Sequence, residues 1–260
     1  MTIETESYMY QKLLHTVYEY LLNEKCAHLD LDNLERIVVV SNNELPDGVD
    51  ARYRNRQVLI KEESVKNVLA YISKRDMNKY IFKEIKDSLD NNMKLLIDNV
   101  MHELFHCDAE KKMPALHAMV YSDSEEPWEG CTARFWIECT VEYNSNKNSF
   151  LRKEKLLEQI SNAKWEIDCF FGNENEEKTM YKLIYVASYF VPLNLLYGTE
   201  ETYLKNVNDK QTYSLYSKLF VICRELLDKE GYVDDYSQIE SIENAFKNYF
   251  DKLGVKTFWT

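Results

Sequence analysis

Residues 102 to 106 read His-Glu-Leu-Phe-His, which is an H-E-x-x-H motif. Residues four positions apart on a helix lie one turn above each other, so the imidazoles of His102 and His106 can reach one metal ion. Glu103 projects beside that ion, where a base must stand to take a proton from a metal-bound water. The motif therefore predicts two metal ligands and a general base for metal-assisted hydrolysis.

A long helix over residues 93–109 is expected to carry this motif. Apolar residues recur at helical spacing before His102, and no Pro or Gly occurs between Lys79 and Met113. The two apolar residues inside the motif are expected to bury the helix against a core. The metal-free alternative is a buried helix with two hydrogen-bonded core histidines.

A catalytic zinc ion commonly takes three protein ligands and leaves a fourth position to water. An extended H-E-x-x-H-x-x-G-x-x-H motif is excluded, because Ala109 and Lys112 stand where it needs Gly and His. His117 is one alternative third ligand, but it follows the helix after only a short turn. The ligand set favours zinc, although iron(II) uses a similar set of two histidines and one carboxylate.

Glu138 and Glu142 are the better candidates, because their spacing places both on one face of a helix expected over residues 131–146. Aromatic and aliphatic neighbours predict partial burial, and a buried carboxylate needs a metal, a cation or hydrogen-bond donors. We expect Glu138 to bind the metal and Glu142 to accept the Nδ1–H of a ligand histidine. The two glutamates could also exchange these roles.

Hydrolysis at such a site also needs a group that stabilises the developing oxyanion, usually Tyr, His or Arg. Tyr121, Tyr143, His117 and Arg134 are candidates from their positions near the two predicted site helices. The chain has 19 Tyr, so the sequence does not rank these candidates.

These motifs resemble those of zincin metallopeptidases, in particular the glutamate-ligand branch, the gluzincins. His102, Glu103, His106 and Glu138 match the ligand and base positions of that branch, and Glu142 stands where it often has Asp. The resemblance is greatest to compact bacterial versions such as ImmA/IrrE-type domains. It implies a zinc-dependent peptidase that acts on a peptide or protein substrate.

The segment before the motif also looks zincin-like. Residues 37–40 form an expected strand, and Val49 to Arg54 with Gln57 to Lys61 form an expected strand pair. Zincins place such a small sheet before the active-site helix, and its edge strand lines the substrate cleft. The resemblance covers about residues 35 to 147 and implies a zincin-like core.

The rest of the chain reads as helical, so the expected fold class is α+β and predominantly helical. Helical patterns cover residues 7–25 and 64–92, and a connector is expected over 111–130. Further helices are expected over residues 151–171, 177–196, 199–207, 212–229 and 236–252. We expect a catalytic region at 1–147 and a helical region at 148–260, packed on it or forming one continuous domain.

Composition limits the functional classes. The formal net charge of −12 and the absence of a sustained basic run argue against a nucleic-acid partner. No apolar run is long enough to cross a membrane. The 6 Cys form no C-x-x-C pair and the start of the chain is acidic, so reduced thiols in a cytoplasm are expected. Cys107 and Cys139 adjoin predicted ligands but point elsewhere on their helices, so both are expected to be packing residues.

Two functional hypotheses follow. The first is a zinc-dependent hydrolase, specifically a metallopeptidase with Glu103 as general base. The second is a non-catalytic regulatory or interaction protein that keeps a metal-binding site of this kind. Substitution of Glu103 by Gln separates them, because only an enzyme depends on that base. The sequence indicates neither the substrate nor the oligomeric state.

Overall fold

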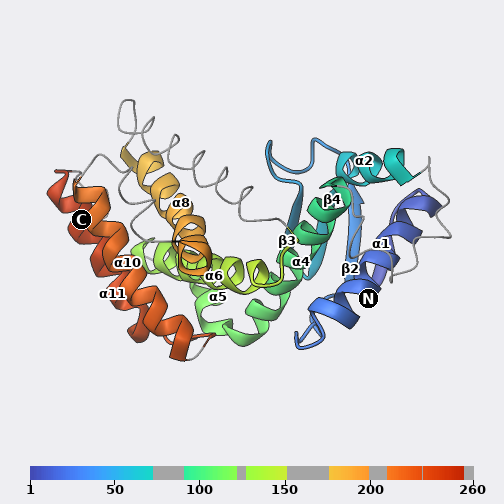
Figure 1. Cartoon of the computed structure of the whole chain (residues 1–260). Coiled ribbons are helices and arrows are strands. Elements are labelled where there is room, and N and C mark those ends of the chain that lie inside the picture. Colours follow the sequence, from blue (N-terminus) through green and yellow to red (C-terminus); the bar gives the residue numbers. More distant parts are fainter. Residues whose placement is uncertain (73–90, 122–126, 151–175, 199–209, 230, 255–260) are drawn as a thin grey trace. The chain divides into compact units, whose positions relative to one another are not determined.

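The structure is a computed structural model, and it describes residues 1–72, 91–121, 127–150, 176–198, 210–229 and 231–254 (Figure 1). Its contacts divide the chain into two compact units. Unit 1 comprises Met1–Lys111 with Asn148–Leu151, and unit 2 comprises Lys112–Lys147 with Arg152–Thr260. Helices predominate among the described residues and one four-stranded sheet is present, which confirms the α+β, predominantly helical class. The expected division near residue 147 stays a prediction.

The sheet lies in unit 1 and has the strand order β1-β2-β4-β3. β1 (Thr2–Glu4) and β4 (Gln57–Lys61) pair parallel with β2 (Arg36–Val40), and β3 (Ala51–Arg54) pairs antiparallel with β4. The three strands expected from the sequence are confirmed. β1 was not expected, because a three-residue segment with one apolar residue carries too weak an alternation to identify.

A two-residue turn joins β3 to β4 and sets their register. Asn55 has φ 51° and Arg56 has φ 62°, so both lie in the left-handed region. Two-residue hairpin loops of this kind match the right-handed twist of the strands. Asn tolerates the left-handed region, but Arg56 occupies the position that Gly usually takes. The hairpin therefore forms at a local conformational cost.

Two helical segments and the sheet bury a common apolar core in unit 1. Residues 7–25 are confirmed as helical, with α1 (Tyr8–Tyr20) continuing into the π-helical turn η1 (Leu21–Lys25). α2 (Glu62–Ile72) starts directly after β4, which confirms the first part of the helical prediction for 64–92. Residues 73–90 lie outside the described residues. The core side chains include Leu13, Leu14, Val17, Tyr20, Leu21, Ile37, Val58, Ile60, Val65 and Val68.

The expected helix at 93–109 is confirmed as α4 (Asn91–Lys112). Buried residues occur around most of its circumference, so buried polar side chains on α4 need partners within the protein. The Asp98 carboxylate accepts a hydrogen bond from Ser149 Oγ at 2.8 Å. The fully buried Asp108 accepts one from the backbone N of Asp30 at 2.8 Å. These bonds fix the rotation of α4 in unit 1.

Unit 2 is helical in its described residues. It contains α5 (Pro114–Tyr121), α6 (Pro127–Asn146), α8 (Glu176–Tyr197), α10 (Lys210–Lys229) and α11 (Tyr236–Lys252). The helices expected over 131–146, 177–196, 212–229 and 236–252 are confirmed. Those expected over 151–171 and 199–207 lie outside the described residues.

The prediction of a connector over residues 111–130 was wrong. This segment contains α5 and the first turn of α6, each of which begins at a proline, Pro114 and Pro127. Proline interrupts a helix in its interior, but it is well tolerated in the first helical turn, where its missing N–H would have no intrahelical partner.

Helix α6 packs against α5, α8 and α11, and α10 packs against α8 and α11 (Figure 1). Two polar contacts hold the segment before α11 to this group of helices. Trp136 Nε1 donates to the carbonyl of Val233 at 3.2 Å. The Asp234 carboxylate accepts from the backbone N atoms of Ala115 and Leu116 at 3.1 and 3.0 Å, which caps the start of α5. No helix in the described part of the chain is long and apolar enough to span a membrane.

The hairpin turn gives a prediction for stability. Replacing Arg56 by Gly should raise the free energy of unfolding by about 0.5–1 kcal/mol, because Gly adopts the left-handed conformation without a Cβ clash. The exposed ion pair of Arg56 with Glu35 (3.5 Å) contributes little and does not offset this gain. Denaturant unfolding measures the change. Arg54→Gly, on strand β3, is the matched control and should destabilise the protein; a stabilising effect of both variants would contradict the explanation.

Candidate metal centre

The two histidines of the motif face each other on α4. Their Nε2 atoms are 3.1 Å apart, and the ring centroids are 4.8 Å apart at an interplanar angle of 79°. Both side chains are half-buried. The predicted convergence of His102 and His106 is therefore found within a single helix of unit 1.

The spacing of these nitrogens fits a metal ion. Two nitrogens bound tetrahedrally to one zinc ion at about 2.0–2.1 Å lie roughly 3.3–3.4 Å apart, close to the 3.1 Å observed between the two Nε2 atoms. A single N–H···N hydrogen bond between neutral imidazoles also suits 3.1 Å, which corresponds to the metal-free alternative. A third ligand distinguishes the two interpretations.

Glu138 lies on α6 and is half-buried. His102, His106 and Glu138 each offer one potential ligand atom, and these atoms lie within 4.8 Å of one another. No other group of three or more His, Cys, Asp or Glu side chains suited to a metal ion occurs in the described ranges of the chain, and His117 is not a member of this group. Two imidazoles and one carboxylate match the donor set that zinc takes in hydrolytic sites.

Glu103 is buried, with 7% of its surface exposed, and accepts a hydrogen bond at Oε2 from the backbone N of Tyr53. Tyr53 lies on β3 opposite Val58 of β4. In a two-residue hairpin the pair next to the turn, here Arg54 and Gln57, is hydrogen-bonded. The next pair away from the turn, Tyr53 and Val58, is not, so the Tyr53 amide points away from the partner strand. Glu103 therefore binds the outward-facing amide of the edge strand, which fixes the orientation of its carboxylate.

Glu142 lies one turn after Glu138 and is buried, with 8% of its surface exposed. Its Oε2 accepts a hydrogen bond from Asn146 Nδ2 at 2.6 Å, and the same nitrogen also donates to the Glu142 carbonyl at 2.8 Å. The carbonyl of Asn146 accepts from the Tyr197 hydroxyl at 2.5 Å, which connects the end of α6 to α8. Asn146 thus fixes the Glu142 side chain. The predicted bond from Glu142 to a ligand histidine stays a prediction.

Two tyrosines of α8 share the electrostatic environment of these glutamates and were missed by the sequence analysis. Tyr189 donates from its hydroxyl to the Tyr185 hydroxyl at 2.9 Å. Desolvation raises the pKa of Tyr185, and the negative charges of Glu138 and Glu142 raise it further. The pKa of Tyr189 is raised well above its ordinary value by burial and by the same two carboxylates. Both phenols therefore stay protonated and can act as hydrogen-bond donors.

The oxyanion candidates named from the sequence all belong to unit 2. Tyr143 has the Lys147 ammonium 4.0 Å from its ring centroid. Burial raises the pKa of Tyr143, and the charged groups acting on it after burial are Asp228, which raises the pKa, and Arg224, which lowers it. This places Tyr143 in an electrostatic environment different from that of Tyr185.

Arg134 is exposed on α6, and its positive charge lowers the pKa of Tyr185 against the larger opposing effects. His117 is half-buried on α5. Tyr121 is the last residue of α5, and its side chain lies outside the described residues. The roles assigned to these residues stay predictions.

The cysteines next to the ligands are packed inside the protein. Cys107 and Cys139 are fully buried, as expected for packing residues. Burial raises the pKa of the Cys107 thiol to about 11.

The Tyr53 hydroxyl donates to Glu110 Oε2, so both the backbone and the side chain of Tyr53 bind acidic residues of α4. Edge strand and helix are thereby held together on unit 1.

Comparisons with protein-family models, curated proteins and solved structures found no match for this chain. The zincin resemblance therefore depends on the motif residues and their arrangement.

The burial of the thiols gives a prediction about their reactivity. At pH 8 the thiols of Cys107 and Cys26, with pKa values of about 11 and 12, stay protonated and enclosed, so iodoacetamide should not label them in the native protein. Cys131, which is partly exposed, should be labelled first among the cysteines described. Peptide mapping by mass spectrometry measures the order. Rapid native labelling of Cys107 would contradict its packing role, and labelling in denaturant is the control.

Proposed function

We propose that this protein is a zinc-dependent hydrolase, specifically a peptidase with a zincin-like core. The observation that carries the proposal is the group of His102, His106 and Glu138, whose potential ligand atoms lie within 4.8 Å of one another. The buried Glu103 on the same helix supplies the base that a purely metal-storing site does not need. The residues present fit the donor set of a catalytic zinc ion.

The proposed chemistry divides among the ion, the side chains of Glu103 and Tyr185, and the backbone amide of Tyr53. Zinc, when bound, supplies a Lewis acid that lowers the pKa of a coordinated water to about 7. Glu103 accepts the proton of the attacking water and passes it to the leaving amine. The Tyr53 amide keeps the Glu103 carboxylate oriented during both transfers, since it binds Oε2. Tyr185 donates a hydrogen bond to the developing oxyanion, because its own oxygen already accepts from Tyr189.

The edge strand supports a peptide as the substrate. β3 is the last strand in the order β1-β2-β4-β3, so the outward-facing backbone groups that Glu103 does not occupy can pair with an extended peptide, as sheet edges do in many complexes. Glu103 contacts that strand at Tyr53. A peptide aligned along β3 therefore carries its carbonyl groups past the proposed base.

Metal analysis tests the ligand set. The wild-type protein should contain about one zinc ion per chain, and His102→Ala, His106→Ala and Glu138→Ala should each lower that content strongly, because each removes one of three protein ligands. Elemental analysis on proteins purified side by side gives the result. His15→Ala is the matched control, since His15 is exposed on α1 and pairs with Glu19. A metal-free wild type that cannot be reloaded would favour the core-histidine interpretation.

Substitution of the base separates an enzyme from a metal-binding regulator. Glu103→Gln should keep the zinc content and the fold but lower the turnover of a peptide substrate by at least about 100-fold, because the amide cannot accept the proton. A quenched-fluorescent peptide library is the assay, and Glu19→Gln, an exposed site on α1, is the control. Peptide hydrolysis that survives in Glu103→Gln would exclude the proposed mechanism. Absence of hydrolysis in the zinc-loaded wild type would favour the non-catalytic alternative.

Tyr185 has its own test. Tyr185→Phe should lower kcat by about 100-fold with little change in KM and no loss of zinc, because a transition-state donor is removed and ground-state contacts remain. Tyr213→Phe on α10 is the matched control for this variant, since Tyr185 and Tyr213 are both 46% exposed. Equal kcat in Tyr185→Phe and wild type would assign oxyanion stabilisation to another residue.

A further inference from the structure

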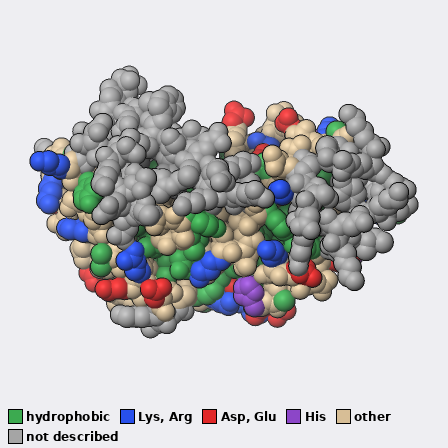
Figure 2. Space-filling view, viewed as in Figure 1, with side chains coloured by type: hydrophobic (Ala, Val, Ile, Leu, Met, Phe, Trp, Pro, Cys, Tyr) green, Lys and Arg blue, Asp and Glu red, His purple; other side chains and the backbone are tan. Residues whose placement is uncertain are grey.

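A pocket between α10 and α11 contains several lysines and shares no described lining residue with the proposed catalytic site. It has a volume of about 190 Å³ and is lined by Lys210, Lys218 and Lys252, with no acidic residue among the described residues that line it. Figure 2 shows Lys and Arg side chains over the region of these helices in unit 2. The whole chain has a formal net charge of −12, so a pocket whose described lining has three lysines and no carboxylate differs from the average surface.

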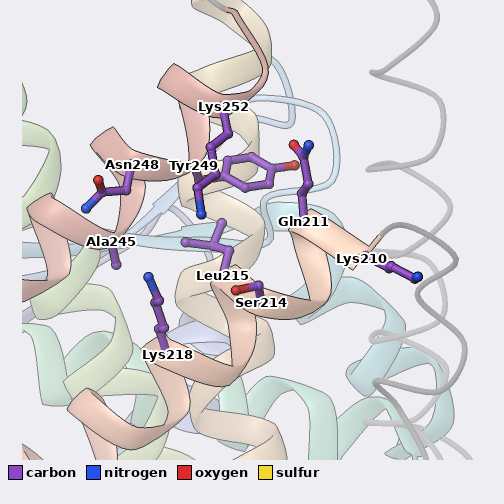
Figure 3. Close-up of a pocket in the computed structure, with 9 residues that line it drawn as sticks. All are labelled: Lys210, Gln211, Ser214, Leu215, Lys218, Ala245, Asn248, Tyr249 and Lys252. Atoms are coloured by element: carbon purple, nitrogen blue, oxygen red, sulfur yellow. The ribbon is translucent and has the colours of Figure 1, made fainter.

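Helix geometry places these lysines around one space. Lys210 and Lys218 lie two turns apart on α10, whereas Lys252 lies in the last turn of α11. In Figure 3 the side chains of Lys218 and Lys252 extend toward each other from the two helices, whereas that of Lys210 points outward at the rim. Two ammonium groups thus converge on the same opening.

The floor of the pocket is apolar and fixed. Leu215, Ala245 and Tyr249 are 2%, 6% and 4% exposed. The Tyr249 hydroxyl and Thr212 Oγ1 form a buried hydrogen bond of 2.8 Å that joins the two helices beneath the opening. The walls are therefore held at a set distance, and the floor offers a surface for a small apolar group.

The lysines of this pocket also differ from other lysines in their ion pairs. Among the residues that the structure describes, no carboxylate forms an ion pair with Lys210, Lys218 or Lys252. By contrast, Lys247 on the same helix α11 pairs with Glu243. Like charges that converge without a carboxylate repel each other, and a bound anion removes that repulsion.

We propose that this pocket binds a small phosphate monoester. Lysine binds phosphate as a point charge, whereas a planar carboxylate is bound best by the bidentate arginine side chain. No arginine occurs among the described residues that line the pocket. An apolar cavity of about 150 Å³ holds a benzene molecule, so the 190 Å³ pocket fits a small ring or short alkyl group with the phosphate at its mouth. The site does not depend on the proposed hydrolase activity.

Calorimetric titration with phenyl phosphate tests the proposal. The wild-type protein should bind it at millimolar concentrations or below, and Lys218→Ala and Lys252→Ala should each weaken binding by about tenfold through loss of a charge-assisted hydrogen bond. Lys247→Ala is the matched control, because it removes one positive charge from α11 outside the pocket, and its affinity should equal that of wild type. Binding should also weaken as the salt concentration rises.

A phosphate could also bind a metal ion, so the titration is repeated on His102→Ala after treatment with a chelator. Unchanged affinity in that variant supports the pocket as the site. Three results would overturn the proposal: no binding of phenyl phosphate, equal binding by wild type and the Lys218→Ala/Lys252→Ala double variant, or tighter binding of malonate than of phenyl phosphate and inorganic phosphate.

Discussion

The need to provide partners for polar groups on a buried helix governs the arrangement of the candidate site. Helix α4 is buried around most of its circumference, and a buried polar group without a hydrogen bond costs free energy. Asp98, Glu103 and Asp108 each accept a bond from another segment of unit 1, and all three accept from a backbone amide that cannot move independently of the fold. These contacts fix the rotation of the helix, and with it the direction in which His102 and His106 point.

The edge hairpin and the helix constrain each other. Tyr53 binds Glu103 through its backbone and Glu110 through its hydroxyl, so the strand is held at two points along α4. The left-handed conformations of Asn55 and Arg56 fix the register of the hairpin and therefore decide which amide faces the helix. A shift of one residue would turn that amide away from Glu103. The position of the base thus depends on a turn that lies outside the site.

Local patterns in the sequence predicted the parts of the site that one helix contains. The spacing of His102 and His106 predicted that their imidazoles face each other, and that of Glu138 and Glu142 predicted a shared helix face, because a regular helix converts spacing directly into direction. Tyr185 and Tyr189 could not be identified in this way. Their relation to Glu138 and Glu142 arises from the packing of α6 on α8, and the sequence holds 19 tyrosines with no local mark on these two. The binding of Glu103 by the Tyr53 amide was equally inaccessible, because every residue except proline has such an amide.

That last contact has a consequence for how this protein can vary. Because Tyr53 holds Glu103 through its main chain, a change of side chain at this position leaves the donor in place, and only proline removes it. For this contact the constraint on position 53 is therefore one of exclusion, whereas the hydroxyl contact with Glu110 additionally favours tyrosine there. A change of side chain would lose the hold on Glu110 and keep the hold on Glu103, and proline would lose both.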